Sequence, residues 1–454
     1  MDFVPSFIYY GINLNKDKMI GFKHSIGSKK IAVLGAGRSG IAASSALLRM
    51  GAKVLLSDRG KIRHHLEQID IEEYGHTSRI FQNDMVVLSP SVCIHNPLIK
   101  RLISIKIPII SELELGYRLT DGTYIAITGT NGKTTTTNLI HEMIKGSKKA
   151  GNVGIPLSEY AGKSGTFVVE TSSFQLMTID TFRPDIGMIL NLEEDHLDWH
   201  KSFEEYKYAK SKIFMNQTPS DVLILNYDDK NTRSFKDKAK SRVFFVSIEK
   251  KVKGAFYQGK TLYLNIENPV PIIDSDEMQI RGLHNIYNAL FASVASYLYH
   301  KDMDIIRRVL RTFKGLPHRI EYIGEINGIK FYNDSKGTNP HAVLWALKGF
   351  EKNVILILGG EDKNLSFGIL RDDIKKRARF IIVIGEARPR IIRELSGTKP
   401  IYLANSMDEV IDIALKYGRE GDTVLLSPGC SSYDMYKNYK ERGDDFRRSV
   451  KKRA

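Results

Sequence analysis

The sequence has 454 residues, which corresponds to roughly two to four domains at about 100–200 residues each. Hydrophobic residues make up 42% and charged residues 26%, a globular balance that excludes collagen-like, coiled-coil and disordered proteins. The net charge of +15 favours anionic partners, whether phosphorylated small molecules, nucleic acid or a membrane surface.

Cysteine usage and the absence of long apolar runs predict a cytoplasmic protein. Only Cys93 and Cys430 are present, without a CxxC spacing, which argues against a disulfide framework and a cysteine-type zinc site. No apolar run reaches the length of about 18 residues that a membrane span needs. Residues 1–30 lack the pattern of a signal peptide and show no periodicity, so we assign them no structure.

Short β-branched runs that end in Gly, Ser or Asp recur along the chain, with helix-like stretches between them. They form three groups: residues 31–37, 53–58, 85–90 and 107–111; residues 124–132, 166–173, 186–192 and 221–226; and residues 353–360, 380–385, 400–404 and 423–429. Continuous apolar strands with helices between them are typical of parallel sheets buried on both faces. The pattern predicts three α/β units. Residues 243–248 and 261–266 are predicted as a small antiparallel appendage to the second unit.

The first glycine-rich loop is GAGRSG at residues 35–40, directly after a predicted strand, and Asp58 ends the next strand. Taken alone, this arrangement is a dinucleotide fingerprint. It indicates a tight turn that lets the backbone approach a diphosphate, whichever nucleotide carries it. Close packing without a ligand is the alternative.

The strongest local signal is ITGTNGKTTTT at residues 127–137, where a strand, a glycine-containing loop and a helix start follow one another. Backbone N–H groups of such a loop and the positive helix terminus form a cradle for phosphate. Lys133 would reach the β- and γ-phosphates, and the Thr134 hydroxyl would bind Mg²⁺. The loop departs from the Walker A pattern because Ile127 stands where the first glycine would be. A chance Gly-Lys-Thr turn is the alternative.

Acidic segments follow two further strands of the second unit. Glu170 ends one strand and is placed like a Mg²⁺ ligand beside a phosphate loop, because hard cations take oxygen ligands. His196 lies in an acidic cluster, where a histidine is either a surface or capping residue or, beside an ATP site, a metal ligand. The acidic neighbours are Glu193, Glu194, Asp195 and Asp198.

Polar segments also follow strands of the third unit. They are residues 331–340, 359–367 and 426–446. Each is predicted at the carboxyl edge of a sheet, where open α/β folds bind ligands. Lys336 and Lys363 could neutralise a phosphate or a substrate carboxylate, and Asp334 could hold a cation or ammonium. Simple solvent exposure is the alternative for each lysine.

These blocks, in this order, resemble the Mur ligase family of ATP-dependent amide-bond-forming enzymes. The matching motifs are GTNGKTT, ETSSFQL, NLEEDHLD, GLHNIYNAL, LPHR, NDSKGTN and LSPGCSSYD, and the resemblance runs from about residue 30 to the C-terminus. VETSSFQL and LSPGCSSYDMYKNYKERG are the blocks most specific to the member that adds D-glutamate. The phosphate loop alone would not distinguish that member from other muramyl ligases or folylpolyglutamate synthase.

The resemblance implies an α/β fold with three domains. Residues 1–112 would form a Rossmann-like domain for the UDP part of the substrate, with residues 1–30 as an unassigned extension. Residues 113–315 would form a P-loop ATPase-like central domain with a mostly parallel sheet. Residues 316–454 would form a Rossmann-like α/β domain that closes over the amino acid and ATP.

The resemblance also assigns site residues in the first two domains. The GAGRSG loop would hold the uracil-diphosphate part rather than NAD, and the matching substrate positions are Arg38, Ser39, Asp58, Arg59 and Asn152. ATP would meet Gly129, Thr130, Asn131, Gly132, Lys133, Thr134 and Thr135, with Asn285 and Asn288 on the adenine side. Two Mg²⁺ ions would be held by Thr134, Glu170, His196 and Lys210, the last matching the family's carbamylated lysine. A carbamate supplies anionic oxygens suited to hard cations, whereas an ammonium beside two Mg²⁺ ions would be repelled.

From the third domain, Arg319, Asp334 and Lys336 would approach ATP in the family's arrangement. The positions that match residues around D-glutamate are Thr338, Lys363, Ser432 and Tyr439, the last replacing a more usual phenylalanine. Lys133, His196, Lys210, Asp334 and Lys336 are the residues with implied catalytic roles.

The implied reaction is ATP-dependent addition of D-glutamate to UDP-N-acetylmuramoyl-L-alanine through an acyl phosphate, in cytoplasmic peptidoglycan precursor synthesis. We expect small-molecule substrates, no nucleic-acid or membrane partner, and a monomer. A ligase of the same family with a different amino-acid acceptor is the first alternative. An NAD-dependent oxidoreductase would leave the phosphate loop and the later motifs unexplained. A nucleic-acid-stimulated ATPase is the other alternative, and the sequence shows no recognisable RNA- or DNA-binding module for it.

Overall fold

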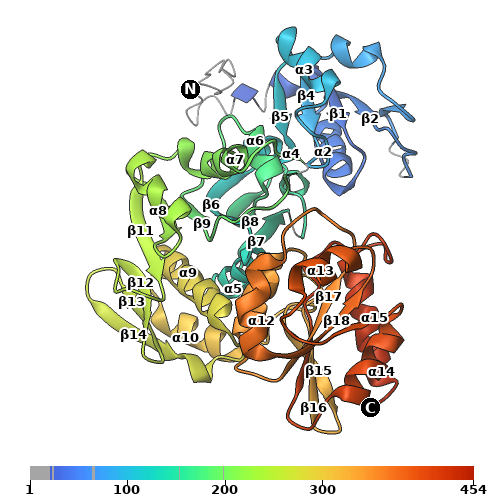
Figure 1. Ribbon diagram of the computed structural model, residues 1–454. Helices are drawn as coiled ribbons and strands as arrows, with labels where there is room; N and C mark the ends of the chain where they lie inside the picture. Colours follow the sequence, from blue (N-terminus) through green and yellow to red (C-terminus); the bar gives the residue numbers. More distant parts are fainter. Residues whose placement is uncertain (1–20, 23–24, 64–66, 153, 198) are drawn as a thin grey trace, which may run out of the picture. The chain divides into compact units, whose positions relative to one another are not determined.

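The computed structural model describes residues 21–22, 25–63, 67–152, 154–197 and 199–454 (Figure 1). The chain divides into two compact units. The first contains the described residues up to Val246 with Val252–Gly254 and Phe291–Lys301, and the second contains Ser247–Lys251, Ala255–Leu290 and Asp302–Ala454. Residues 1–20 and 23–24 of the unassigned N-terminal segment lie outside the described residues. A 3₁₀ helix at Ile26–Ser28 does form there, with Ile26 fully buried, so the expectation of no structure over residues 1–30 is wrong at this point.

The first sheet is wholly parallel, with five strands in the order β3-β2-β1-β4-β5. Its strands are β1 (Lys30–Leu34), β2 (Lys53–Ser57), β3 (Asp70–Glu72), β4 (Met85–Leu88) and β5 (Ile109–Ser111). The helices that belong with it are α2 (Arg38–Arg49), α3 (Pro97–Ser104) and α4 (Glu112–Leu119), with a 3₁₀ turn at Ser78–Gln82. Buried apolar clusters on both faces explain why its strands are nearly continuous in apolar residues.

The central sheet has a parallel part in the order β11-β10-β9-β6-β8-β7. Its strands are β6 (Asp121–Thr128), β7 (Lys148–Gly151), β8 (Ser164–Glu170), β9 (Ile186–Ile189), β10 (Val222–Asn226) and β11 (Arg242–Ser247). The helical segments over this stretch are α5 (Lys133–Met143), Leu157–Tyr160, α6 (Ser173–Met177), α7 (Phe203–Met215), α8 (Lys230–Arg233) and η4 (Ser234–Lys238).

Three further strands and two helices follow in the chain: β12 (Gly254–Gln258), β13 (Thr261–Asn265), β14 (Pro269–Asp274), α9 (Leu283–His300) and α10 (Met303–Thr312). Strand β13 pairs with β14 in antiparallel fashion. Strand β11 lies between β10 and β12 and runs parallel to β10, so on that side the residues 243–248 predicted as part of an antiparallel appendage extend the parallel sheet. Its apolar alternation cannot distinguish the two directions, because both place side chains with a period of two.

The third sheet has the order β15-β16-β20-β17-β18-β19 and is parallel except for the hairpin of its first two strands. Its strands are β15 (Glu321–Ile326), β16 (Ile329–Asn333), β17 (Val354–Gly359), β18 (Ala378–Ile384), β19 (Ile401–Leu403) and β20 (Thr423–Leu426). Its helices are α11 (Pro340–Lys348), α12 (Arg371–Arg377), α13 (Arg388–Leu395), α14 (Met407–Tyr417) and α15 (Tyr439–Lys451). Helices α14 and α15 lie side by side (Figure 1).

The three sheets confirm the predicted α/β architecture with one mostly parallel sheet in each domain. Helix α4 explains why the first boundary is hard to place from the sequence. Its Leu115 and Leu119 pack in the core of the first sheet, whereas Leu113 packs in the core of the central sheet. The predicted boundaries at residues 112 and 315 therefore stay predictions.

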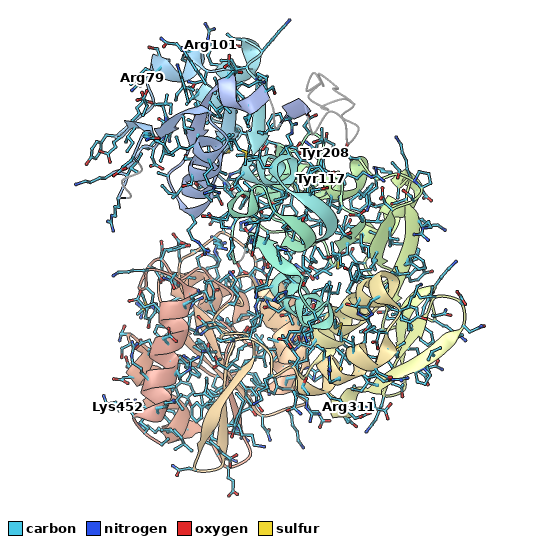
Figure 2. The ribbon with its side chains drawn as sticks, turned by 180° about the vertical axis from the view of Figure 1, so that it is seen from behind. Arg79, Arg101, Tyr117, Tyr208, Arg311 and Lys452 are labelled. Carbon is cyan, nitrogen blue, oxygen red and sulfur yellow. The ribbon has the colours of Figure 1, made fainter. Side chains whose placement is uncertain are left out.

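The positive charge is spread over many elements of the surface. Figure 2 labels basic side chains that project from four separate segments: Arg79, Arg101, Arg311 and Lys452. Arg79 pairs with Asp70 at 2.7 Å and Arg311 with Glu277 at 2.8 Å, and exposed pairs of this kind add at most about 1 kcal/mol of stability. Within the described ranges, every helix is too short or too polar to cross a membrane.

Candidate active site

The GAGRSG loop joins β1 to α2 in a tight turn. An added Cβ on Gly40 would lie 1.8 Å from the carbonyl oxygen of Gly35, so only glycine fits where the first turn of α2 passes Gly35. Asp58 holds this loop, because its carboxylate accepts a hydrogen bond from the backbone N–H of Ala36 at 2.6 Å. Its other oxygen accepts from the N–H of Gly60, two residues further on, at 2.7 Å. The predicted contact of Asp58 with substrate stays a prediction; in the structure one of its oxygens accepts from the glycine loop and the other from Gly60.

The other predicted positions of this region lie at the start of α2 and after β2. Arg38 begins α2 and donates from its exposed guanidinium to the carbonyl of Gly154, next to Asn152. Ser39 is half-buried in the first turn of α2, and Arg59 is exposed directly after Asp58. In the region predicted to bind the uridine part, Arg38 is therefore hydrogen-bonded to the segment that contains Asn152.

The phosphate loop ends β6 and begins α5, as predicted. Gly132 caps α5 with φ of 84°, a left-handed backbone that other residues adopt only with strain. Lys133 is the first helical residue, and its ammonium donates to the carbonyl oxygens of Gly129 and Thr130, each at 2.8 Å. Thr134 and Thr135 are buried in the first turn. The loop thus curls around its own lysine at the N-terminus of α5, where backbone N–H groups are able to bind a phosphate.

The segment after β9 supports the phosphate loop from one side. The Asn191 side-chain oxygen accepts from the backbone N–H of Asn131 at 2.8 Å, and the Asn131 amide donates to Glu193 at 2.9 Å. The Thr130 hydroxyl lies 3.0 Å from the Tyr206 hydroxyl and accepts from the Glu193 backbone N–H at 3.0 Å. Asn191 was not among the predicted residues, although its place directly after a strand was a usable signal.

Glu170 lies at the end of β8, next to β6, with only 1% of its surface exposed. One carboxylate oxygen accepts from the Asn152 side-chain amide at 3.0 Å. Its other oxygen, Oε2, is buried and has no hydrogen-bond partner. A buried carboxylate oxygen without a partner is costly, and a bound cation is one way to satisfy it.

Lys210 reaches the phosphate loop from α7. It is 2% exposed, and its nitrogen donates to the Gly129 carbonyl at 2.8 Å and lies 3.4 Å from the Thr128 hydroxyl. The same carbonyl oxygen receives Lys133, so two lysine side chains converge on one acceptor. Burial, followed by the Lys133 charge, holds the pKa of Lys210 well below its ordinary value. The nearby carboxylates of Asp195 and Glu170 act in the opposite direction.

His196 sits on a strained turn after the acidic segment. Its φ is 55°, its side chain is 40% exposed, and its Nε2 lies 3.7 Å from the Asp195 carboxylate. The ring packs edge-on against Phe174 of the VETSSFQL segment, with centroids 4.9 Å apart. Asp198, in the same acidic cluster, lies outside the described residues.

His200 is a buried neighbour that the sequence reasoning missed. Its Nε2 lies 2.9 Å from the Ser173 hydroxyl, whereas its Nδ1 is buried without a partner. Burial and the charge on Lys210 lower the pKa of His200 to about 3, so the ring is neutral at pH 7. Its neutral ring packs between Phe174 and Tyr206, beside the lysine.

In the second unit, Asp334 and Lys336 follow β16 as predicted. Asp334 is buried and accepts from the Ser427 hydroxyl at 2.7 Å. Burial raises its pKa to about 7, although Ser427 and the Arg319 charge oppose the rise. The Lys336 ammonium lies 4.1 Å from the centre of the Tyr439 ring. The predicted residues Arg319, Asp334, Lys336 and Tyr439 therefore lie near one another at the carboxyl end of the third sheet.

The other predicted residues of this unit fall into three places. Asn288 donates to the Asn285 side-chain oxygen at 3.1 Å within the first turns of α9. Thr338 stands directly before Asn339, which caps α11. A bridge between Glu361 and Ser431 brings the segment of Lys363 to that of the buried Ser432.

The structure therefore gathers Lys133, Glu170 and Lys210 in one unit and Arg319, Asp334, Lys336 and Tyr439 in the other. Over the residues with described positions, no cluster of three or more His, Cys, Asp or Glu side chains could hold a metal ion.

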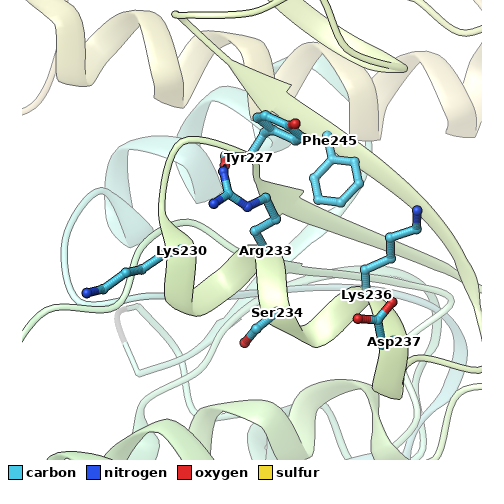
Figure 3. A pocket seen from close by; sticks show the side chains of 7 residues that line it. All are labelled: Tyr227, Lys230, Arg233, Ser234, Lys236, Asp237 and Phe245. Carbon is cyan, nitrogen blue, oxygen red and sulfur yellow. The ribbon is translucent and has the colours of Figure 1, made fainter.

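A pocket of about 430 Å³ lies elsewhere in the first unit, around α8 and η4 (Figure 3). It is lined by Tyr227, Lys230, Arg233, Ser234, Lys236, Asp237 and Phe245. The Arg233 guanidinium lies 5.0 Å from the centre of the Tyr227 ring, which packs edge-on against Phe245. None of the residues predicted from the motifs lines this pocket.

Comparison with known proteins gives matches over most of the chain. The Mur ligase middle domain matches residues 127–296, and the glutamate ligase domain of Mur ligases matches residues 318–430. The chain is 40% identical over 443 residues to UDP-N-acetylmuramoylalanine–D-glutamate ligase of Caldanaerobacter subterraneus, covering 93% of this chain and 98% of that one. It is 36% identical over 442 residues to the enzyme of the same name from Clostridioides difficile, with the same coverage.

Solved structures of lower identity share the fold. A pseudomurein peptide ligase type C from Methanothermus fervidus has a TM-score of 0.60 at 21% identity, covering 94% of this chain and all of that one. MurF ligase from Thermotoga maritima, in complex with ADP, has a TM-score of 0.60 at 14% identity, covering 95% of this chain and all of that one.

Proposed function

The chain belongs to the Mur ligase family, and from this premise we propose that it joins D-glutamate to UDP-N-acetylmuramoyl-L-alanine at the expense of ATP. The observation that carries the proposal is the convergence of Lys133 and Lys210 on the Gly129 carbonyl, beside the unpartnered oxygen of Glu170. The relatives named as D-glutamate ligases match over 98% of their own length, which supports the choice of acceptor.

The chemistry begins with an unreactive carboxylate. An amine cannot displace an oxygen from a carboxylate, because the oxide ion is too basic to act as a leaving group. The substrate carboxylate therefore first attacks the γ-phosphate of ATP, giving an acyl phosphate and ADP. The amine of D-glutamate then attacks the acyl carbon, and inorganic phosphate leaves. Because two anions meet in the first step, the ammonium of Lys133 and the N–H groups at the start of α5 neutralise the developing charge.

Glu170, Thr134, His196 and Lys210, the last as a carbamate, are the residues proposed to hold Mg²⁺. The fit rests on the Glu170 Oε2 atom, a buried oxygen with no partner and of the hard type that Mg²⁺ prefers. The ions would supply charge neutralisation at the transferred phosphoryl group. The two-ion stoichiometry is part of this proposal.

Lys210 is proposed to be carbamylated. Formation of a carbamate requires a neutral amine, and burial beside Lys133 lowers the pKa of Lys210 in the direction that favours it. The resulting anion would face the Lys133 ammonium across the Gly129 carbonyl, which turns a repulsion into an attraction.

The remaining predicted roles follow the domain order. Residues 1–112 would bind the UDP part through Arg38, Ser39, Asp58 and Arg59, and Asp58 also holds the glycine loop through Ala36. Asn152 of the central domain would contact the same substrate. Residues 113–315 would bind ATP, with Asn285 and Asn288 on the adenine side.

Residues 316–454 would supply Arg319, Asp334 and Lys336 to ATP. The positions proposed around D-glutamate are Thr338, Lys363, Ser432 and Tyr439. We propose a monomer in the cytoplasm, where ATP and the nucleotide-linked substrate are found.

A panel of amino-acid acceptors tests the proposed function. The purified protein is mixed with UDP-N-acetylmuramoyl-L-alanine, ATP and Mg²⁺, and phosphate release is measured with D-glutamate, L-glutamate, L-alanine, L-lysine or meso-diaminopimelate. Release that depends on D-glutamate is expected. Release with a different acceptor would assign the chain another place in the family, and the absence of release with every acceptor would refute the ligase activity.

A further inference from the structure

A buried arginine joins three loops of the third sheet, and no predicted role includes it. Arg442 lies in the first turn of α15 with 2% of its surface exposed. Its Nε donates to the Ser335 hydroxyl at 3.0 Å, and Nη2 donates to the carbonyls of Ser335 at 2.9 Å and Cys430 at 3.0 Å. Nη1 donates to the carbonyls of Ser431 at 3.0 Å and Gly359 at 3.5 Å.

All five N–H donors of the guanidinium are thereby used. The planar guanidinium of arginine can donate to several acceptors at fixed angles, whereas lysine has three donors on one rotating nitrogen. The acceptors are backbone carbonyls and one hydroxyl. None of these acceptors carries a charge, so hydrogen bonds to uncharged groups stabilise the buried guanidinium.

Each loop that Arg442 binds leads into the proposed acceptor region. Ser335 stands between Asp334 and Lys336, and its hydroxyl also donates to the Tyr439 carbonyl at 2.8 Å. Cys430 and Ser431 directly precede Ser432, and Gly359 ends β17. One side chain therefore sets the spacing between the loop of Lys336 and the loop of Ser432.

We propose that Arg442 is a positioning residue, which holds these two loops at the separation needed to bind the amino-acid acceptor. The inference rests on the proposed function for the identity of that acceptor. Arg442 acts through the loops and does not itself touch substrate. A misplacement of about 1 Å at a reacting centre can cost on the order of 10²-fold in rate, so a lost anchor should be visible in the kinetics.

The test is Arg442→Lys, which keeps the positive charge and removes the planar guanidinium. The KM for D-glutamate should rise at least about tenfold and kcat should fall, while the KM for UDP-N-acetylmuramoyl-L-alanine stays within about twofold, because that substrate is assigned to another sheet. Thermal denaturation establishes that the variant is folded at the assay temperature. Arg448→Lys is the matched control, since Arg448 lies on the same helix with a side chain that is 68% exposed, and its constants should not change.

A lower melting temperature with unchanged kinetic constants would show that Arg442 is only structural and would overturn the proposal. If Arg442→Lys does not fold, Ser335→Ala decides, because it removes the hydroxyl between Arg442 and Tyr439. A rise of about threefold or more in the acceptor KM supports the proposal, and an unchanged KM refutes it. The wild type is assayed in parallel with the acceptor it uses, so a different acceptor refutes the proposed D-glutamate specificity without affecting this comparison.

Discussion

Lys210→Ala should abolish most of the ligase activity, and short carboxylic acids should restore part of it. The nitrogens of Lys210 and Lys133 each lie 2.8 Å from the Gly129 carbonyl oxygen, so they are no more than twice that distance apart. Two like charges about 5 Å apart repel by about 3 kcal/mol at an effective dielectric constant of about 20. A carbamate on Lys210 changes the sign of this energy, whereas alanine removes that charge altogether.

Loss of one preorganised electrostatic partner typically lowers kcat by about 10²–10³-fold, which is the effect expected for Lys210→Ala. Phosphate release is measured for the variant with and without formate, acetate or propionate. A small carboxylate that enters the vacated space should raise kcat several-fold in a saturable manner.

Lys212→Ala is the matched control, because Lys212 is a second buried lysine of α7 that donates to the carbonyls of Met177 and Ile179. It should lower stability, and carboxylates should not restore any lost activity. Near-normal turnover of Lys210→Ala, or equal restoration of both variants, would refute the reasoning.

Three other variants test separate parts of the account. Lys133→Ala should remain folded by circular dichroism yet lose at least about 10²-fold in kcat, and near-normal turnover would remove its role at the phosphates. Asp58→Ala removes the hydrogen bond that holds the Ala36 N–H of the glycine loop, and a second one to Gly60, so the KM for the UDP-linked substrate should rise several-fold while the KM for ATP stays constant; equal changes in both would contradict this assignment. Burial raises the pKa of Glu112 to about 7, so the folded state holds a proton that the unfolded chain has released above about pH 4.5. This contribution to stability is full at low pH and is lost as the pH rises toward 7, so Glu112→Gln should gain melting temperature relative to the wild type between pH 5 and about 8. Parallel pH profiles would show that this carboxyl does not titrate in the way described.

The parallel strands and the first turns of their helices could be predicted because each carries a local signal. Continuous apolar runs predicted β1, β6 and β17, and Gly132 before Lys133 marked the start of α5. Strand β7 was missed because its residues Lys148–Gly151 are short and half polar, and only its pairing with β8 makes it a strand. Local pattern cannot supply such a partner.

The site residues divide in the same way. Lys133, Glu170 and Asp334 follow strands, so the sheet edge on which they lie could be predicted. The roles of Asp58 and Arg442 could not, because they depend on which backbone groups the folded loops present to them. Tertiary contacts decide whether a buried carboxylate faces a ligand or its own loop, and the spacing of residues in the sequence does not determine those contacts.

Oxygen transfer from substrate to phosphate tests the central claim most directly. UDP-N-acetylmuramoyl-L-alanine labelled with ¹⁸O in its terminal carboxylate is converted in the presence of ATP, Mg²⁺ and D-glutamate, and the released phosphate is analysed by mass spectrometry or ³¹P NMR. An acyl phosphate requires that one labelled oxygen leave with each phosphate. Product formed with unlabelled phosphate would contradict activation of the carboxylate at the phosphate loop.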